Sequence, residues 1–200
     1  MIAIIDYGAG NIFSVKNALD YLGVENKLTA DKNEICAADE VILPGVGAFP
    51  WAMKMLRDSG LVDTIREEAR KKPFLGICLG MQLIFDKGYE FEETDGLRLI
   101  GGKVEKIDRK DMIIPHMGWN ELEINRDCPI LKGIPEHPYV YFVHSYAAVC
   151  DEANVSAYCD YGGKITALVH DGAYVYGAQF HPEKSGEVGL QMLRNFAELA

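Results

Sequence analysis

A cysteine between two glycines, placed where a short apolar run gives way to a helical pattern, constrains the fold more than any other feature. The segment is Phe74-Leu75-Gly76-Ile77-Cys78-Leu79-Gly80-Met81-Gln82. In a Gly-x-nucleophile-x-Gly turn, larger side chains would collide with the strand and helix on either side of a sharp bend. Such a bend would present the Cys78 sulfur at the N-terminus of a helix, whose dipole favours a thiolate. The segment therefore predicts a strand, a turn and a helix that carry a candidate nucleophile, with a buried structural thiol as the alternative.

A candidate base and a candidate orienting carboxylate follow near the C-terminus, in Gly177-Ala178-Gln179-Phe180-His181-Pro182-Glu183. Alternating residues predict a strand up to Phe180, and Pro182 cannot continue a sheet ladder, so we expect His181 at the strand's end. A cysteine nucleophile needs an imidazole to take and return its proton, and that imidazole needs a carboxylate to fix its tautomer. His181 and Glu183 can supply these groups. A surface or capping role is the alternative for His181, and the coincidence with the cysteine turn favours catalysis.

A second glycine-rich loop, Leu43-Pro44-Gly45-Val46-Gly47-Ala48-Phe49, follows a predicted strand and precedes a predicted helix. In open α/β sheets, such loops gather at the site along the carboxyl ends of the strands. The glycine spacing matches neither a dinucleotide-binding motif nor a P-loop, which argues against a phosphate site. We predict an oxyanion hole, with one N–H from Leu79 and the second from Val46 or Gly47. A plain tight turn is the alternative.

The order of hydrophobic segments predicts an α/β fold. Buried strands are expected at 2–5, 41–43 and 74–75, with helical patterns at 12–22, 53–56 and 65–69 between them. This alternation predicts an open, mostly parallel sheet with helices on both faces. Asn11 is expected to cap the first helix and Ser185 the last one. Period-two segments predict antiparallel strands added to the sheet or its edge, at 103–107, 139–143, 155–158 and 165–169.

Composition favours a cytoplasmic enzyme of one domain, residues 1–200. The chain has 200 residues, 48% of them hydrophobic, and neither a linker nor a repeat divides it. Its five cysteines are scattered, which indicates a reducing compartment without a disulfide framework or a metal site. We expect neither a signal peptide nor a membrane-spanning segment. The formal net charge of −10 disfavours binding to nucleic acid.

Together these motifs resemble the class I, or triad, glutamine amidotransferases, and the resemblance covers nearly the whole chain. It rests on Gly76–Gln82, Pro44–Gly47 and Gln179–Glu183. Within the class, further stretches are similar to the HisH-type glutaminase subunits of imidazole glycerol phosphate synthases, in histidine biosynthesis. These stretches are 6–11, 43–49, 115–120, 141–146 and 183–185. Pro50-Trp51 departs from the family pattern, which more often has a small or polar pair there.

The resemblance implies hydrolysis of L-glutamine to glutamate and ammonia, without a metal or organic cofactor. Cys78 would attack the side-chain amide to form a thioester, and His181, held by Glu183, would protonate the departing ammonia and then activate water. The residues implied to hold the amino-acid end of the substrate are Gln82, Ser145 and Tyr146.

The resemblance also implies a partner, the cyclase subunit of imidazole glycerol phosphate synthase, in a heterodimer. Ammonia released into water is protonated and lost, so the family passes it to this subunit. The residues expected at the interface are Asn11, Trp119, Tyr141 and Lys184. A core position at a strand end is the alternative for Trp119.

Two other functions stay open at this stage. One is an ammonia donor for another synthase, of the anthranilate or pyridoxal phosphate type, against which the stretch 115–120 argues. The other is a non-catalytic scaffold, which would have no reason to keep the three candidate catalytic residues. Among the other histidines, His137 and His170 are expected in solvated turns, whereas His116 and His144 have no assigned role.

Overall fold

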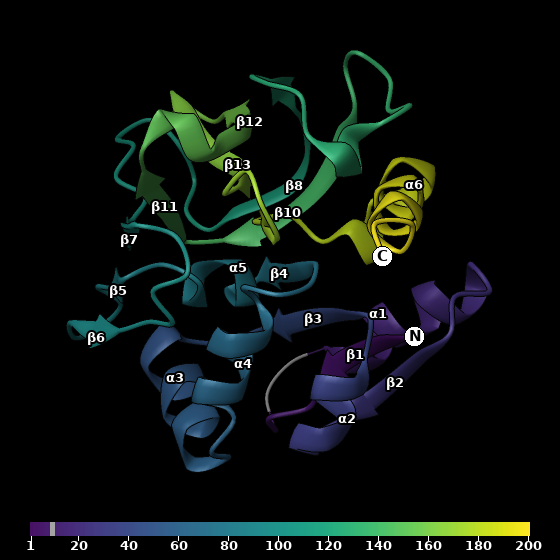
Figure 1. Cartoon of the computed structure of the whole chain (residues 1–200). Coiled ribbons are helices and arrows are strands. Elements are labelled where there is room, and N and C mark those ends of the chain that lie inside the picture. The colour runs from purple at the N-terminus through teal and green to yellow at the C-terminus, as the bar shows by residue number, and fades with distance from the viewer. Residues whose placement is uncertain (9–10) are drawn as a thin grey trace.

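An eight-stranded sheet forms the centre of the computed structural model, which describes residues 1–8 and 11–200 (Figure 1). Ala9 and Gly10, which belong to the stretch 6–11, lie outside the described residues. The strand order is β2-β1-β3-β4-β14-β13-β12-β9. The five strands from β2 to β14 are parallel and the remaining pairs are antiparallel, so the predicted sheet is confirmed. The bounds are β1 (Ile2–Ile5), β2 (Asn26–Thr29), β3 (Glu40–Gly45), β4 (Phe74–Cys78), β9 (Glu123–Ile124), β12 (Val155–Asp160), β13 (Lys164–His170) and β14 (Val175–Ala178).

Helices cover both faces of this sheet because successive side chains of a buried strand point to opposite sides. In β1, Ile2 and Ile4 belong to one apolar cluster with side chains of α1 and α6, whereas Ala3 and Ile5 belong to another with side chains of α2, α3 and α4. Figure 1 shows α1 and α6 near the two chain ends, and α3 and α4 together on another side. None of the helices in the described part of the chain is long and apolar enough to cross a bilayer. Their bounds are α1 (Ile12–Tyr21), α2 (Lys32–Ala37), α3 (Phe49–Asp58), α4 (Val62–Glu68), α5 (Leu79–Leu83) and α6 (Gly186–Phe196).

Two smaller sheets contain segments that were expected to extend the central one. Segments 103–107 and 139–143 form β7 and β10, but β10 pairs with β8 and β7 lies in a sheet of order β11-β7-β5-β6. A period-two pattern specifies a half-buried strand without specifying its partner, so the predicted pairing was wrong for these two segments. The bounds are β5 (Lys87–Gly88), β6 (Thr94–Asp95), β7 (Gly102–Lys106), β8 (His116–Glu121), β10 (Tyr139–His144) and β11 (Tyr146–Cys150); the 3-10 turns are η1 (Pro129–Leu131), η2 (Glu152–Asn154) and η3 (Pro182–Lys184).

Two predicted capping residues occupy the N-cap positions, but their side chains have other partners. The Asn11 side-chain oxygen accepts from the Ser14 hydroxyl at 2.7 Å instead of a backbone N–H of α1. The Ser185 hydroxyl donates to the His181 carbonyl at 2.6 Å and accepts from the Tyr141 N–H at 3.0 Å. The His181 N–H in turn donates to the Tyr141 carbonyl at 2.9 Å. Ser185 therefore fastens the segment around His181 to β10, a role that its position before a helix did not reveal.

The strand-turn-helix prediction at Cys78 is confirmed, and the flanking glycines are required by close backbone contacts. Cys78 has φ of 54° and ψ of −110°, in the region that non-glycine residues rarely adopt. A Cβ on Gly76 would lie 2.6 Å from the Gly80 carbonyl oxygen, and one on Gly80 would lie 1.8 Å from the Leu43 carbonyl oxygen. The helix α5 can therefore pack directly on the backbone of β3 and β4 only because both positions lack a side chain.

We expect Gly80→Ala to destabilise the protein by about 1–3 kcal/mol, as overpacking does. In a helix, alanine is otherwise more favourable than glycine by about 1 kcal/mol. A lower free energy of unfolding in Gly80→Ala would therefore identify the collision with the Leu43 carbonyl. Urea unfolding gives the free energy. Gly101→Ala is the control, because a Cβ there would meet only an Asp86 carboxylate oxygen at 3.9 Å. A Gly80→Ala protein as stable as the wild type would contradict this account of the turn.

Candidate active site

The strand order brings three segments that are distant in sequence to one edge of the sheet. Strands β3, β4 and β14 are parallel neighbours, with Gly45 paired to Cys78 and Ile77 paired to Ala178. The glycine loop, the cysteine turn and the segment that contains His181 therefore leave the sheet side by side. This is the edge where open α/β sheets place their sites.

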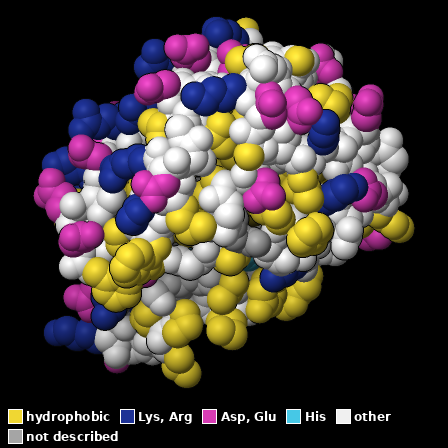
Figure 2. Space-filling model, turned by 90° about the horizontal axis from the view of Figure 1, so that it is seen from below, with side chains coloured by type: hydrophobic (Ala, Val, Ile, Leu, Met, Phe, Trp, Pro, Cys, Tyr) yellow, Lys and Arg dark blue, Asp and Glu magenta, His cyan; other side chains and the backbone are white. Residues whose placement is uncertain are grey.

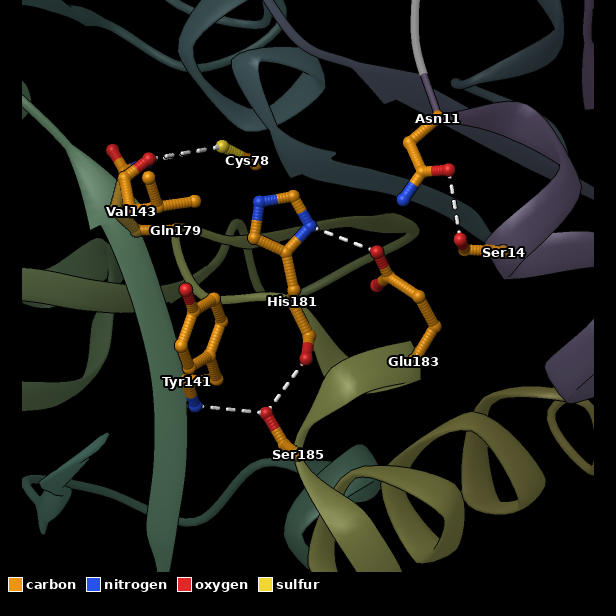
Figure 3. Close-up of polar contacts among 9 residues, drawn as sticks. All are labelled: Asn11, Ser14, Cys78, Tyr141, Val143, Gln179, His181, Glu183 and Ser185. Atoms are coloured by element: carbon orange, nitrogen blue, oxygen red, sulfur yellow. Dashed lines mark hydrogen bonds and ion pairs between the residues drawn. The ribbon is translucent and has the colours of Figure 1, made fainter. Parts of the chain in front are cut away.

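Cys78, His181 and Glu183 form a continuous arrangement at this edge (Figure 3). The His181 Nδ1–H donates to the Glu183 carboxylate at 2.8 Å, and both side chains are almost fully buried. Figure 3 shows the other ring nitrogen, Nε2, turned toward Cys78, and this nitrogen has no hydrogen-bond partner among the described residues. The Cys78 sulfur instead lies 4.0 Å from the Val143 carbonyl oxygen. The geometry leaves Nε2 available to exchange a proton with the sulfur.

The surroundings of His181 favour its protonated form. Burial disfavours the imidazolium, but the interactions with Cys78 and Glu183 outweigh burial and raise the pKa of His181 to about 9. The ring can therefore carry a proton at neutral pH between the sulfur and the carboxylate. An imidazolium in this place stabilises a thiolate, which is the nucleophilic form of cysteine.

A pocket of about 280 Å³ opens onto the Cys78 sulfur. It is lined by every residue that the sequence suggested for the oxyanion hole and for substrate binding, namely Val46, Gly47, Leu79, Gln82, Ser145 and Tyr146. The other lining residues are Glu90, Pro115, Val143, His144 and His181. Within residues 1–8 and 11–200, no group of three His, Cys, Asp or Glu side chains could hold a metal ion.

Glu90 is a pocket residue that the sequence did not single out. It belongs to the acidic stretch 90–93, in which no spacing distinguishes one carboxylate from the next. Its carboxylate accepts the N–H of Phe49, the first residue of α3, at 2.8 Å. This contact connects the carboxylate to the helix that follows the glycine loop, a relation that only the tertiary structure shows.

Two uncharged histidines support the pocket wall around residue 146. The Tyr146 carbonyl can only accept, so the His144 Nδ1 that lies 2.8 Å away carries the proton. The His144 Nε2 must then accept from the His116 Nδ1–H at 3.0 Å. Burial lowers the pKa of both imidazoles to about 4, so they stay neutral at physiological pH. His170, which was expected in a solvated turn, is instead buried at the end of β13 and stacked on Tyr176.

The predicted interface residues lie around the same edge. Trp119 is 56% exposed, which excludes the alternative of a core position. It faces Tyr141 across the β8–β10 pair, with ring centroids 6.2 Å apart in an edge-on arrangement. Lys184 is exposed, and Asn11 lines a narrow cavity that His181 also lines. Their contact with a partner remains a prediction.

Known proteins match this chain along nearly its whole length. The model of the family described as "Glutamine amidotransferase class-I" matches residues 3–199. The chain belongs to this family and is a glutamine amidotransferase. It is 51% identical over 197 residues to the "Imidazole glycerol phosphate synthase subunit HisH" of Bacillus cereus (strain G9842), covering 98% of this chain and 93% of the relative. The subunit of the same name from Listeria monocytogenes serotype 4b (strain CLIP80459) is 50% identical over 201 residues, covering 100% and 96%.

Solved structures show the same fold at lower sequence identity. A crystal structure of a glutamine amidotransferase has a TM-score of 0.78 at 23% identity, covering 100% of this chain and 98% of the other. The structure of PurLQS from Thermotoga maritima has a TM-score of 0.74 at 21% identity, covering 98% and 96%. The architecture is therefore that of class I glutamine amidotransferases.

The raised pKa of His181 predicts a pH-dependent stability. The value of about 9 lies above the ordinary histidine value of about 6.5, so the stabilisation is fully present below about pH 6.5 and lost as the pH rises through about 9. Urea titrations should therefore give a lower free energy of unfolding at pH 9.5 than at pH 6.5. The decrease should be smaller in Glu183→Gln, which lacks one of the groups that raise the pKa of His181. Equal decreases in both proteins would contradict this assignment of charge.

Proposed function

We propose that this chain is the glutaminase subunit of an imidazole glycerol phosphate synthase, working as one domain over residues 1–200. It hydrolyses L-glutamine and passes the ammonia to a cyclase subunit, as part of histidine biosynthesis. The observation that carries the proposal is the pocket lined by Cys78 and His181, together with the 2.8 Å bond from His181 to Glu183 behind it. The identity of about half of the aligned positions with HisH subunits, over nearly their whole length, supports the choice of synthase.

In the proposed mechanism the Cys78 sulfur attacks the side-chain amide carbon of glutamine and forms a thioester. The His181 imidazolium gives its Nε2 proton to the departing ammonia, and the same nitrogen then takes a proton from the water that hydrolyses the thioester. The 2.8 Å bond from Nδ1–H to Glu183 keeps the ring in the tautomer and orientation that these steps need. The mechanism uses no metal or organic cofactor.

The charge that develops on the substrate oxygen would be held by backbone N–H groups. Leu79 follows the nucleophile at the start of α5, and Val46 and Gly47 lie in the neighbouring loop on the same pocket. Gly47 has φ of 108°, a backbone conformation that residues with a side chain rarely adopt. Glycine at this position therefore allows the loop a shape that other residues would not. These three residues are the proposed oxyanion hole.

The amino-acid end of glutamine would occupy the part of the pocket farther along from the sulfur. Gln82, Ser145 and Tyr146 are its proposed contacts, and Glu90 adds a carboxylate suited to the substrate ammonium. Gln82 donates through its amide nitrogen to the Tyr146 carbonyl at 3.1 Å, so its amide oxygen is the atom left to accept from the substrate.

The cyclase is proposed to dock over the mouth of this pocket, in a heterodimer. Several exposed apolar side chains lie close in sequence to the pocket residues. Figure 2 shows hydrophobic side chains gathered along one margin of the molecular face in that view, as is typical of interaction surfaces. Phe13 and Met117 each lie two residues along the chain from a predicted interface residue, Val46 lines the pocket, and Trp119 is itself exposed. A cytoplasmic location is also proposed, supported by five cysteines that are all free.

Cys78→Ala should reduce glutamine-dependent synthesis by the heterodimer about 10⁴-fold or more, because the covalent nucleophile is lost. Synthesis from added ammonium salt should continue, since the cyclase does not use this sulfur. Both rates come from steady-state assays of the same preparation. Cys36→Ala is the control, because Cys36 is an exposed free cysteine. Glutamine turnover in the Cys78→Ala protein would refute the assignment.

Trp119→Ala should weaken binding to the cyclase at least about tenfold, as expected for an aromatic side chain at the centre of an interface. The chain has two tryptophans, and Trp51, on α3, is 63% exposed and provides the matched control. Titration calorimetry of each variant with the purified cyclase measures the affinity. Equal affinities for Trp51→Ala and Trp119→Ala would remove Trp119 from the interface. Failure of the wild-type chain to bind any cyclase would favour a different synthase as its partner.

A further inference from the structure

The Cys78 sulfur has a second polar neighbour that the mechanism above does not use. The side-chain nitrogen of Gln179 lies 3.9 Å from the sulfur. Figure 3 shows Gln179 and His181 both reaching toward Cys78 from the segment that follows β14. Gln179 is 0% exposed, and its backbone N–H donates to the Ala167 carbonyl at 2.9 Å. Because the side chain is buried, its carboxamide is not free to turn away into solvent.

A single backbone carbonyl determines which end of this carboxamide faces the sulfur. The Tyr146 carbonyl can only accept, so the atom of Gln82 that lies 3.1 Å from it is the NH₂ group. The same NH₂ group lies 3.1 Å from the side-chain oxygen of Gln179. Because that oxygen is turned to Gln82, the Gln179 NH₂ group is turned to Cys78. The orientation of the Gln179 carboxamide therefore follows from the Tyr146 carbonyl, which can only accept, and not from an arbitrary assignment of its nitrogen and oxygen atoms.

An N–H group that points at the sulfur stabilises the thiolate more than it stabilises the thiol. Hydrogen bonds to a charged acceptor are roughly twice as strong as those between neutral groups, and a buried site shields them little. The His181 imidazolium can stabilise the sulfur's charge only until it gives up its proton. The amide of Gln179 keeps its protons at every stage of a reaction.

We propose that Gln179 is a further catalytic residue, which donates a hydrogen bond to the Cys78 thiolate, and that Gln82 locks it in the donating orientation. Gln82 then has two functions, since its nitrogen fixes Gln179 while its oxygen faces the substrate. The inference rests on the proposed nucleophilic role of Cys78.

The test is the pH dependence of Cys78 alkylation by iodoacetamide, followed on the Cys78 peptide by mass spectrometry. Gln179→Met keeps the length of the side chain and removes the donor. Its alkylation profile should move to higher pH by about one unit, which is about a tenfold change in the ionisation constant of the thiol. Gln179→Glu keeps an oxygen for Gln82 but places a second oxygen beside the sulfur, and its profile should move at least as far.

The control is Asn195→Leu, which removes another buried carboxamide, one that donates to the Ile130 and Lys132 carbonyls. Its alkylation profile should match the wild type. An unchanged profile in folded Gln179→Met and Gln179→Glu proteins would overturn the proposal, and so would an equal shift in Asn195→Leu. Alkylation reports the charge of the sulfur without glutamine turnover, so this failure is distinct from failure of the Cys78→Ala test.

Discussion

The close packing of α5 against the backbone of β3 and β4 is the contact on which the rest of the site depends. A side chain at Gly76 or Gly80 would overlap backbone atoms, so the helix reaches this position only through two glycines. The contact places Cys78 at the edge of the sheet, in a conformation that a non-glycine residue rarely adopts. It also places Leu79 at the start of a helix, on the same pocket as Val46 and Gly47 of the glycine loop. The proposed nucleophile and the proposed oxyanion donor are thus placed by one steric constraint.

Electrostatics then separates the histidines near the pocket into two kinds. His181 has a carboxylate and a sulfur beside it, and these outweigh burial to raise the pKa to about 9. His116 and His144 have no such partners, and burial lowers the pKa of each to about 4. His181 can carry a proton at neutral pH, whereas His116 and His144 serve as neutral hydrogen-bond supports. The difference comes from neighbouring groups, because all three rings are buried.

The Tyr146 carbonyl connects these two sets of groups. It accepts from His144 on one side and from Gln82 on the other, and through Gln82 it fixes the carboxamide of Gln179 beside the sulfur. A backbone oxygen suits this task because it cannot act as a donor, so every side chain bonded to it has a single allowed direction. The pocket wall and the surroundings of the Cys78 sulfur are therefore organised from the same short stretch of β11.

The sequence by itself determined those parts of the protein that depend on local backbone geometry. The glycines around Cys78, the proline between His181 and Glu183, and the apolar runs of the parallel strands each act within a few residues. The turn at Cys78 and the parallel strands were confirmed, whereas β14 ends at Ala178, two residues before the predicted strand end at Phe180. Only the tertiary structure decided the partners of the period-two strands, because alternation specifies a face and not a neighbour. It also decided the burial of His170, the bridge made by Ser185, and the places of Glu90 and Gln179 at the pocket and the sulfur. Each of these depends on a contact between segments far apart in the chain, where no local spacing marks one polar side chain from another.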